Sequence, residues 1–200
     1  MLKNWKARNS FREKGKPIRL THLGFYSKVK KAANDLADLF GNDDRFELHF
    51  YGHGFNTEYH ELIYKKGYKN IFTGGAFSYE DTINYLLNTD IINSYYGYTN
   101  ESPNLRGSFG IKHSYTPMLH LPSLADEDTC WGRMSKPFGL AFLVNDNNLK
   151  TLPNDLYNWY NNLNFEMFCN KCDEFNILID KSQKKLIKKM DEVLCKAKRI

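Results

Sequence analysis

The chain has 200 residues, which is enough for one domain with a full hydrophobic core and short for two. A hydrophobic fraction of 42% and a charged fraction of 26% are ordinary for a globular protein and exclude a disordered or fibrous chain. The net charge of +5 is explained by a solvated lysine-rich helix, so no nucleic-acid partner is expected.

No apolar run is long enough to span a membrane, and the N-terminal stretch MLKNWKARNSFREKGKP has no apolar signal segment. We therefore expect a cytoplasmic protein with reduced thiols. Cys169 and Cys172 form a C-x-x-C within a helical pattern, but no second pair stands at zinc spacing. Neither a metal site nor redox chemistry is predicted there.

Residues 1–16 are polar and unpatterned, so we expect a linker or lead-in before a single domain over 17–200. From there, segments of strand and helix character alternate. Strands are predicted at 18–26, 46–52, 70–74, 90–97, 117–122 and 139–145. Helices are predicted at 30–40, 58–67, 79–89 (with Ser78 as N-cap), near 106–115, at 149–163 and at 165–197.

This alternation predicts an α/β protein with a doubly wound, mostly parallel six-stranded sheet covered by helices on both faces. Ligands of such sheets bind beyond the carboxyl ends of the strands, near the switch in strand order. The loops expected to carry the site are therefore 24–30, 52–57, 74–78, 97–107 and 122–138.

The turn Gly52-His53-Gly54 ends the second predicted strand and resembles the start of a nucleotide site. It lacks the third glycine of G-x-G-x-x-G, and the dinucleotide fingerprint follows the first strand of a sheet. A pyrophosphate cradle and a nicotinamide-dependent oxidoreductase are both disfavoured for this reason. We expect these glycines to let the chain turn tightly while its backbone lines the cleft.

Lys28, Lys30 and Lys31 crowd the start of the first predicted helix, just after Gly24. Cations at a helix start oppose the macrodipole, at a cost of roughly 0.3–1 kcal/mol each. The three lysines are either solvated or placed there to hold an anion, for which a diphosphate fits.

Two later loops are further candidates. In SPNLRGSFGIK, Arg106 and Lys112 are able to add charge to the same phosphate site, and Gly107 and Ser108 leave backbone N–H groups approachable. These are also ordinary loop residues. The run Asp126-Glu127-Asp128 near Trp131 is either solvated or suited to gripping and stacking on a sugar.

The last predicted helix is basic and amphipathic. Its apolar stripe is expected to pack on the sheet, and the alternative is contact with an anionic membrane. The stripe comprises Ile177, Leu178, Leu186, Ile187, Met190 and Leu194.

In order, these segments resemble the C-terminal, donor-binding lobe of glycosyltransferases built from two Rossmann-like domains (type B). The resemblance is to the retaining group that includes capsular-polysaccharide and lipopolysaccharide enzymes. It covers about residues 17–195 through loose motifs, namely RFELHFYGHG, KNIFTGGAFSYEDTINYLLNTDIINSYYG, SPNLRGSFGIKHSYTPMLHLP and GLAFLVNDNNLKTLPNDLYNWY.

The resemblance implies a diphosphate at Gly24 and at one or more of Lys28, Lys30 and Lys31, and a base at the turn Gly75-Ala76-Phe77. Together with the loop residues above, it assigns catalysis to Lys28, Lys31 and Arg106. Donor binding is assigned to Gly24, Lys30, Gly75, Ala76, Phe77, Gly107 and Ser108. The substrate implied is a nucleotide-sugar, with UDP as the expected nucleotide, and no further cofactor or metal is implied.

The chain departs from that family in two ways. The ribose-binding glutamate of the family is expected at the place of Gly110, where this chain has no carboxylate. Either Asp126, Glu127 or Asp128 substitutes for it, or ribose is held otherwise, or donor binding is degraded. The lobe that binds the acceptor glycan or glycolipid is absent from these 200 residues, so this chain is expected to be half of an enzyme that works at the inner membrane face. The alternative is a non-catalytic Rossmann-like binding or regulatory module.

Overall fold

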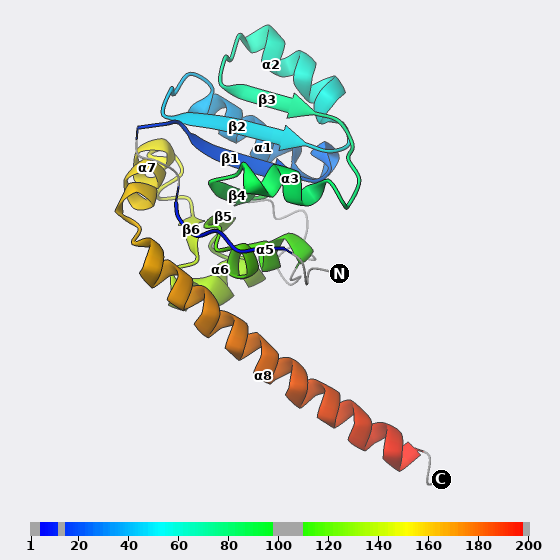
Figure 1. The fold of residues 1–200 in the computed structure, drawn as a ribbon. Helices are drawn as coiled ribbons and strands as arrows, with labels where there is room; N and C mark the ends of the chain where they lie inside the picture. Colours follow the sequence, from blue (N-terminus) through cyan, green and yellow to red (C-terminus); the bar gives the residue numbers. More distant parts are fainter. Residues whose placement is uncertain (1–4, 12–14, 98–109, 198–200) are drawn as a thin grey trace.

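Six parallel strands form one sheet in the order β3-β2-β1-β4-β5-β6 in the computed structural model, which describes residues 5–11, 15–97 and 110–197 (Figure 1). The strands are β1 (Ile18–Leu23), β2 (Phe46–Tyr51), β3 (Ile71–Gly74), β4 (Ile91–Ser94), β5 (Ser123–Asp126) and β6 (Ala141–Val144). The predicted fold class, a doubly wound parallel sheet, is confirmed.

Helical segments connect the strands and cover both faces of the sheet (Figure 1). They are α1 (Tyr26–Phe40), η1 (Phe55–Tyr59), α2 (His60–Lys66), α3 (Thr82–Leu87), α5 (Ile111–Leu119), α6 (Cys130–Ser135), η2 (Lys136–Phe138), α7 (Leu152–Asn162) and α8 (Phe165–Ala197). None of the helices in the described part of the chain combines the length and the apolar character that crossing a bilayer requires.

Neighbouring residues of a strand belong to hydrophobic cores on opposite faces of the sheet, because successive side chains of a strand point to opposite sides. In β4, Ile91 joins the core under α1 and α7, whereas Ile92 joins the core under α3 and α5. In β5, Leu124 lies in the first of these cores and Ala125 packs with α6 and α8. The sheet is thus sandwiched between two helical layers.

The fifth predicted strand, 117–122, is wrong. Pro117 lies inside α5, which ends when His120 adopts a left-handed conformation with φ of 54°. A proline here cannot donate to the carbonyl four residues earlier, so α5 loses one hydrogen bond and depends on the burial of Tyr115 and Leu119 for its stability. The fifth strand begins at Ser123, and its last residue is Asp126.

Two predicted helix starts are also shifted. The first helix begins at Tyr26 instead of residue 30, so Lys28, Lys30 and Lys31 lie within it. The third helix begins at Thr82 instead of residue 79, and Ser78 is not its N-cap. The Ser78 hydroxyl instead accepts a hydrogen bond from the Asp81 backbone N–H at 3.2 Å, within the turn that precedes α3.

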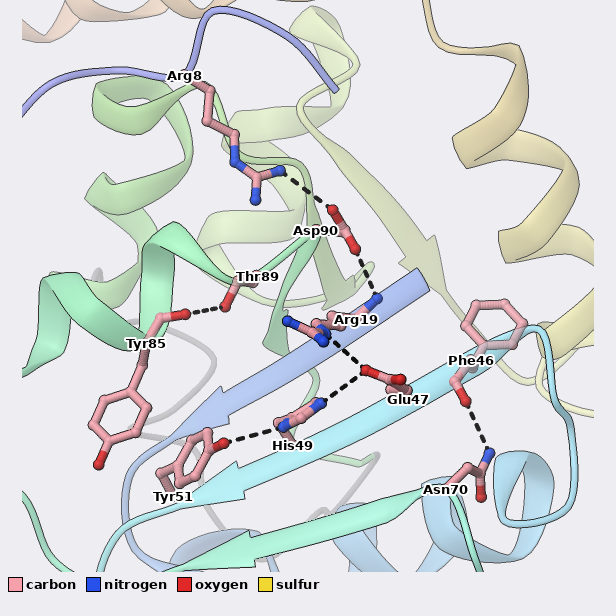
Figure 2. Close-up of polar contacts among 10 residues, drawn as sticks. All are labelled: Arg8, Arg19, Phe46, Glu47, His49, Tyr51, Asn70, Tyr85, Thr89 and Asp90. Atoms are coloured by element: carbon pink, nitrogen blue, oxygen red, sulfur yellow. Dashed lines mark hydrogen bonds and ion pairs between the residues drawn. The ribbon is translucent and has the colours of Figure 1, made fainter. Parts of the chain in front are cut away.

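The half-exposed face of β1 and β2 carries a row of polar contacts, which Figure 2 shows. Arg19 Nε donates to Glu47 Oε2 at 2.7 Å, and His49 bridges this carboxylate and the Tyr51 hydroxyl. The opposite face of β2 holds Phe46, Leu48 and Phe50, which are buried. Polar residues therefore alternate with core residues along the whole strand.

The lead-in segment packs against the domain where it is described. Arg8 Nη1 lies 3.4 Å from Asp90 Oδ1 (Figure 2), and Trp5 stacks near Tyr79 with ring centres 6.1 Å apart. Phe11 contacts the Phe165 ring at the start of α8.

Candidate functional site

The chain reverses its direction across the sheet between β1 and β4. After β1 it continues to β2 on one side, and after β4 it continues to β5 on the other. In open α/β sheets this switch leaves a crevice beyond the carboxyl ends of the two strands. A cleft with a volume of about 450 Å³ lies at this point. It is lined by His22, Leu23, Gly24, Phe25, Lys28, Val29, Phe77, Thr82, Tyr96, Gly110, Ile111, Lys112 and Tyr115.

The first wall of the cleft is the turn from β1 into α1. The turn at Gly52 packs against the backbone of Gly24 in this wall. A Cβ atom on Gly52 would lie 1.7 Å from the Gly24 carbonyl oxygen, and Gly52 has φ of 132°, so only glycine fits. The Gly24 N–H donates to the Tyr51 carbonyl at 2.9 Å. Among the described residues, those lining the cleft do not include 52–54, so the predicted tight turn is present but does not itself form the wall.

The three lysines of α1 point in different directions. Lys28 lines the cleft. Lys30 forms an ion pair with Glu58, and Lys31 Nζ lies 2.5 Å from Asp35 Oδ2 on the outer surface of the helix. Successive helical residues are rotated by about 100°, so three close lysines cannot share one face. The assignment of Lys30 and Lys31 to a diphosphate stays a prediction.

The second wall of the cleft is the start of α5. Gly110 is its N-cap in an extended conformation, and the Gly110 N–H donates to His113 Nδ1 at 3.1 Å. Burial, with Lys112 nearby, lowers the pKa of His113 to about 4, so its ring is neutral and able to accept this bond. The His113 ring also stacks on Trp131 with ring centres 5.6 Å apart. This packing fixes the orientation of the helix start.

Lys112 follows in the first turn of α5. Its ammonium nitrogen lies 4.4 Å from the centre of the Tyr96 ring, which favours the charged form through a cation–π contact. Burial nevertheless lowers the pKa of Lys112 to about 7, and the nearby Asp126 only partly offsets this. An ammonium group with such a pKa gains or loses its proton near neutral pH.

Asp126 lies below the cleft at the end of β5. Its Oδ2 accepts a hydrogen bond from the Tyr96 N–H at 2.8 Å. Its Oδ1 is buried without a hydrogen-bond partner in the described part of the chain. Burial raises the pKa of Asp126 to about 6. Burial, with Asp126 as a second cause, also raises the pKa of Tyr96 to about 12.

The acidic run 126–128 does not act as one cluster. Glu127 Oε1 lies 2.6 Å from Lys136 Nζ, and its other oxygen accepts from Asn145 Nδ2 at 2.8 Å. Trp131 is buried in the core, where its Nε1 donates to Ser123 Oγ at 2.9 Å. The interpretation of Trp131 as a sugar-stacking residue is therefore wrong.

The remaining predicted residues divide into three groups. Phe77 lines the cleft, as Gly24 and Lys28 do. Gly75 lies outside the lining residues, and its carbonyl accepts from the Gly52 N–H at 3.0 Å. Ala76 is also outside them. Arg106, Gly107 and Ser108 fall outside the described residues.

Sequence reasoning missed His22, Thr82, Tyr96 and Tyr115 as lining residues. His22 is buried, and burial together with Lys112 lowers its pKa. The pair Tyr95-Tyr96 directly after β4, at the predicted switch edge, is the signal that points to Tyr96. Tyr115 comes from α5 one helical turn beyond Ile111 and has no comparable signal.

Neither a protein-family model nor a curated protein sequence matches the chain. Solved structures of glycosyltransferases do share its fold. WaaG, a glycosyltransferase involved in lipopolysaccharide biosynthesis, aligns with 84% of this chain and 44% of its own, at 12% identity and a TM-score of 0.58. TarM aligns with 93% of this chain and 36% of its own, at 15% identity and a TM-score of 0.62.

A third similar structure is the pneumococcal O-GlcNAc transferase GtfA in complex with UDP and GlcNAc. It aligns with 92% of this chain and 37% of its own, at 12% identity and a TM-score of 0.55. The chain thus has the Rossmann-like fold found in glycosyltransferases of type B over most of its length. It spans less than half the length of each of these three proteins.

Proposed function

We propose that this chain is the donor-binding half of a retaining glycosyltransferase that builds a surface polysaccharide. The nucleotide-sugar, with UDP as the expected nucleotide, occupies the cleft between β1 and β4. The observation that carries the proposal is the position of this cleft at the switch in strand order, with Lys28 on one wall and Lys112 on the other. The similar proteins TarM and GtfA, whose complexes contain UDP, support it at the level of the fold.

The diphosphate of the donor lies between Lys28 and the start of α5 in this proposal. The positive end of the α5 dipole and two ammonium groups favour an anion there. Negative charge develops on the diphosphate as the bond to the sugar breaks, and charges already in place stabilise it without reorganising. Tyr96, Tyr115 and Phe77 supply aromatic walls for the base or the sugar ring.

One observation favours the alternative, a module that binds nucleotide without catalysis. Gly110, where the resemblance implies a ribose-binding glutamate, lies in the cleft and has no side chain. Asp126, Glu127 and Asp128 are not among the described residues that line the cleft, which favours a ribose site without a carboxylate. Ribose is then held by backbone groups or by the Tyr115 hydroxyl.

Calorimetry with UDP tests the proposed site. Lys28→Ala should weaken UDP binding by at least about tenfold, because a charge-assisted contact to phosphate is worth about 1.5–3 kcal/mol. Lys65→Ala is the control, since Lys65 is exposed on α2 and is not among the described residues that line the cleft. Equal UDP affinity in the two variants would place the diphosphate elsewhere.

A thermal-shift panel of UDP, GDP, ADP and NAD separates the functional classes. A ligand that binds the folded state raises the melting temperature by mass action. We expect UDP to give the largest shift. Stabilisation by NAD alone would favour an oxidoreductase and contradict the proposal.

A further inference from the structure

The helix α8 is 33 residues long, and only its first part packs on the domain. Figure 1 shows the rest projecting away from the sheet as a single rod. Phe168, Cys172 and Phe175 are buried against α6 and the strands β5 and β6, with Ile179 partly buried beside them. The expectation that the named apolar stripe packs on the sheet is therefore wrong for five of its six residues, which are 47–59% exposed, namely Ile177, Leu178, Leu186, Ile187 and Met190. The side chain of the sixth, Leu194, lies outside the described part of the chain.

The buried face of α8 continues into the projecting part. From Phe175 and Ile179 the same face leads, in steps of seven and four residues, to Leu186 and Met190. Ile187 lies beside them, and these three side chains are 55–59% exposed. The face of α8 that packs on the domain therefore remains apolar in the projecting part. There, none of the described residues covers these side chains.

The opposite face of the projecting part is strongly basic. Residues 180–191 contain five lysines and two aspartates, for a net charge of +3. The lysines are Lys181, Lys184, Lys185, Lys188 and Lys189, and all of them are exposed. Lys184 approaches Asp180 at 4.0 Å, which is a weak surface pair.

An apolar stripe backed by lysines is the pattern of a helix that lies in the interface of an anionic bilayer. Its apolar side chains enter the headgroup region, while each lysine near the surface adds about 1 kcal/mol of attraction. A second copy of this chain is a poorer partner, because two helices that each carry +3 repel one another. We propose that residues 179–191 of α8 are a docking surface for an anionic lipid membrane.

This proposal is independent of the nucleotide site, because α8 does not line the cleft in the described part of the chain. Co-sedimentation of the full chain with vesicles tests it. We expect binding to vesicles of phosphatidylcholine and phosphatidylglycerol at 7:3, and at least about tenfold weaker binding to pure phosphatidylcholine.

Two pairs of matched variants separate the charge from the apolar face. Lys184→Gln, Lys185→Gln and Lys188→Gln combined should reduce binding to anionic vesicles by at least about tenfold. The same number of charges removed at the exposed Lys65, Lys69 and Lys150 on the body of the domain should leave most of the binding.

Leu186→Glu with Met190→Glu should also abolish vesicle binding, whereas Tyr64→Glu with Leu87→Glu, at exposed sites elsewhere, should not. Circular dichroism shows whether each variant remains folded. The proposal is overturned if the wild-type chain ignores anionic vesicles, or if both control variants lose as much binding as the α8 variants. Dimerisation through Leu186 and Met190 without vesicle binding would overturn it as well, in favour of a second copy.

Discussion

The Lys112 ammonium group lies 4.4 Å from the centre of the Tyr96 ring, so a helix start and the end of a neighbouring strand meet at the cleft. Asp126 accepts from the Tyr96 backbone N–H just below. Three ionisable groups from α5, β5 and the segment after β4 therefore share one buried place. Because burial shifts the pKa values of Lys112 and Asp126, we expect both UDP binding and the stability of the chain to depend on pH.

Nucleotide binding should be coupled to proton uptake by Lys112. Its pKa is about 7 in the free chain, because burial disfavours the charged form. A bound diphosphate favours that form and raises the pKa, so UDP affinity should fall as pH rises from about 7 to 9. Calorimetry at pH 8 in buffers with different ionisation enthalpies measures the uptake, at a pH where the phosphate of UDP is fully ionised since its last pKa is about 6.

Lys112→Met is the matching variant. It keeps the length of the side chain and removes the charge, so proton uptake should vanish and UDP should bind more weakly at pH 7. An unchanged proton uptake in this variant would assign the titration to another group.

Asp126→Asn should stabilise the chain at neutral pH. Burial raises the pKa of Asp126 to about 6 from 3.8, so the folded state binds more protons than the unfolded state between these values. The free energy of unfolding therefore falls as pH rises from about 4 to about 6. Removing the buried charge should recover about 2–3 kcal/mol at pH 7 and little at pH 4.

Urea denaturation at both pH values measures this change. Glu127→Gln is the control, because Lys136 and Asn145 lower the pKa of the partly exposed Glu127. It should leave neutral-pH stability unchanged or slightly reduced. A loss of stability in Asp126→Asn at pH 7 would show that the charged carboxylate is needed in the fold.

Gly52→Ala should destabilise the chain more than other glycine substitutions. An added Cβ would overlap the Gly24 carbonyl, and the backbone conformation also disfavours alanine. We expect a loss of about 2 kcal/mol or more. Gly67→Ala is the control: Gly67 also has positive φ, at 69°, but open space around it, so about 1 kcal/mol is expected. Thermal or urea unfolding of the two variants separates backbone strain from the overlap.

The 200-residue chain should bind donor without transferring sugar. Transfer needs donor and acceptor held together with water excluded, and such positioning supplies several kcal/mol of barrier reduction. The similar glycosyltransferases are more than twice as long as the region they share with this chain. Incubation with radiolabelled nucleotide-sugars and bacterial membrane extract measures transfer, and robust incorporation into lipid would show that the chain is a complete enzyme.

Periodicity in the sequence predicted five of the six strands and the edge of the sheet at which the cleft lies. It failed at PMLHLP, because an apolar run of six residues suits a strand and the end of a buried helix equally well. The start of α1 was also missed, since Tyr26 and Val29 are buried while the lysines between and after them obscure the apolar spacing.

The site was predictable only where local sequence determines it. Lys28 follows directly from its position after the first strand. The contact of Lys112 with Tyr96, and the burial of Asp126, depend on how α5 and β5 pack beside β4, which no spacing within a single segment reveals. The sequence thus predicted positive charge near the cleft, but it did not predict the contacts among Lys112, Tyr96 and Asp126.

The alternation along β2 also constrains how the chain folds. If β2 paired with β1 one residue out of step, Phe46, Leu48 and Phe50 would move to the half-exposed face, and Glu47 and His49 would enter the core under α1. Burying an ionised carboxylate without its Arg19 partner costs several kcal/mol, and three large apolar side chains would lose their burial. The pairing of β1 with β2 therefore has a single low-energy alignment, which makes a slipped intermediate too unstable to persist during folding.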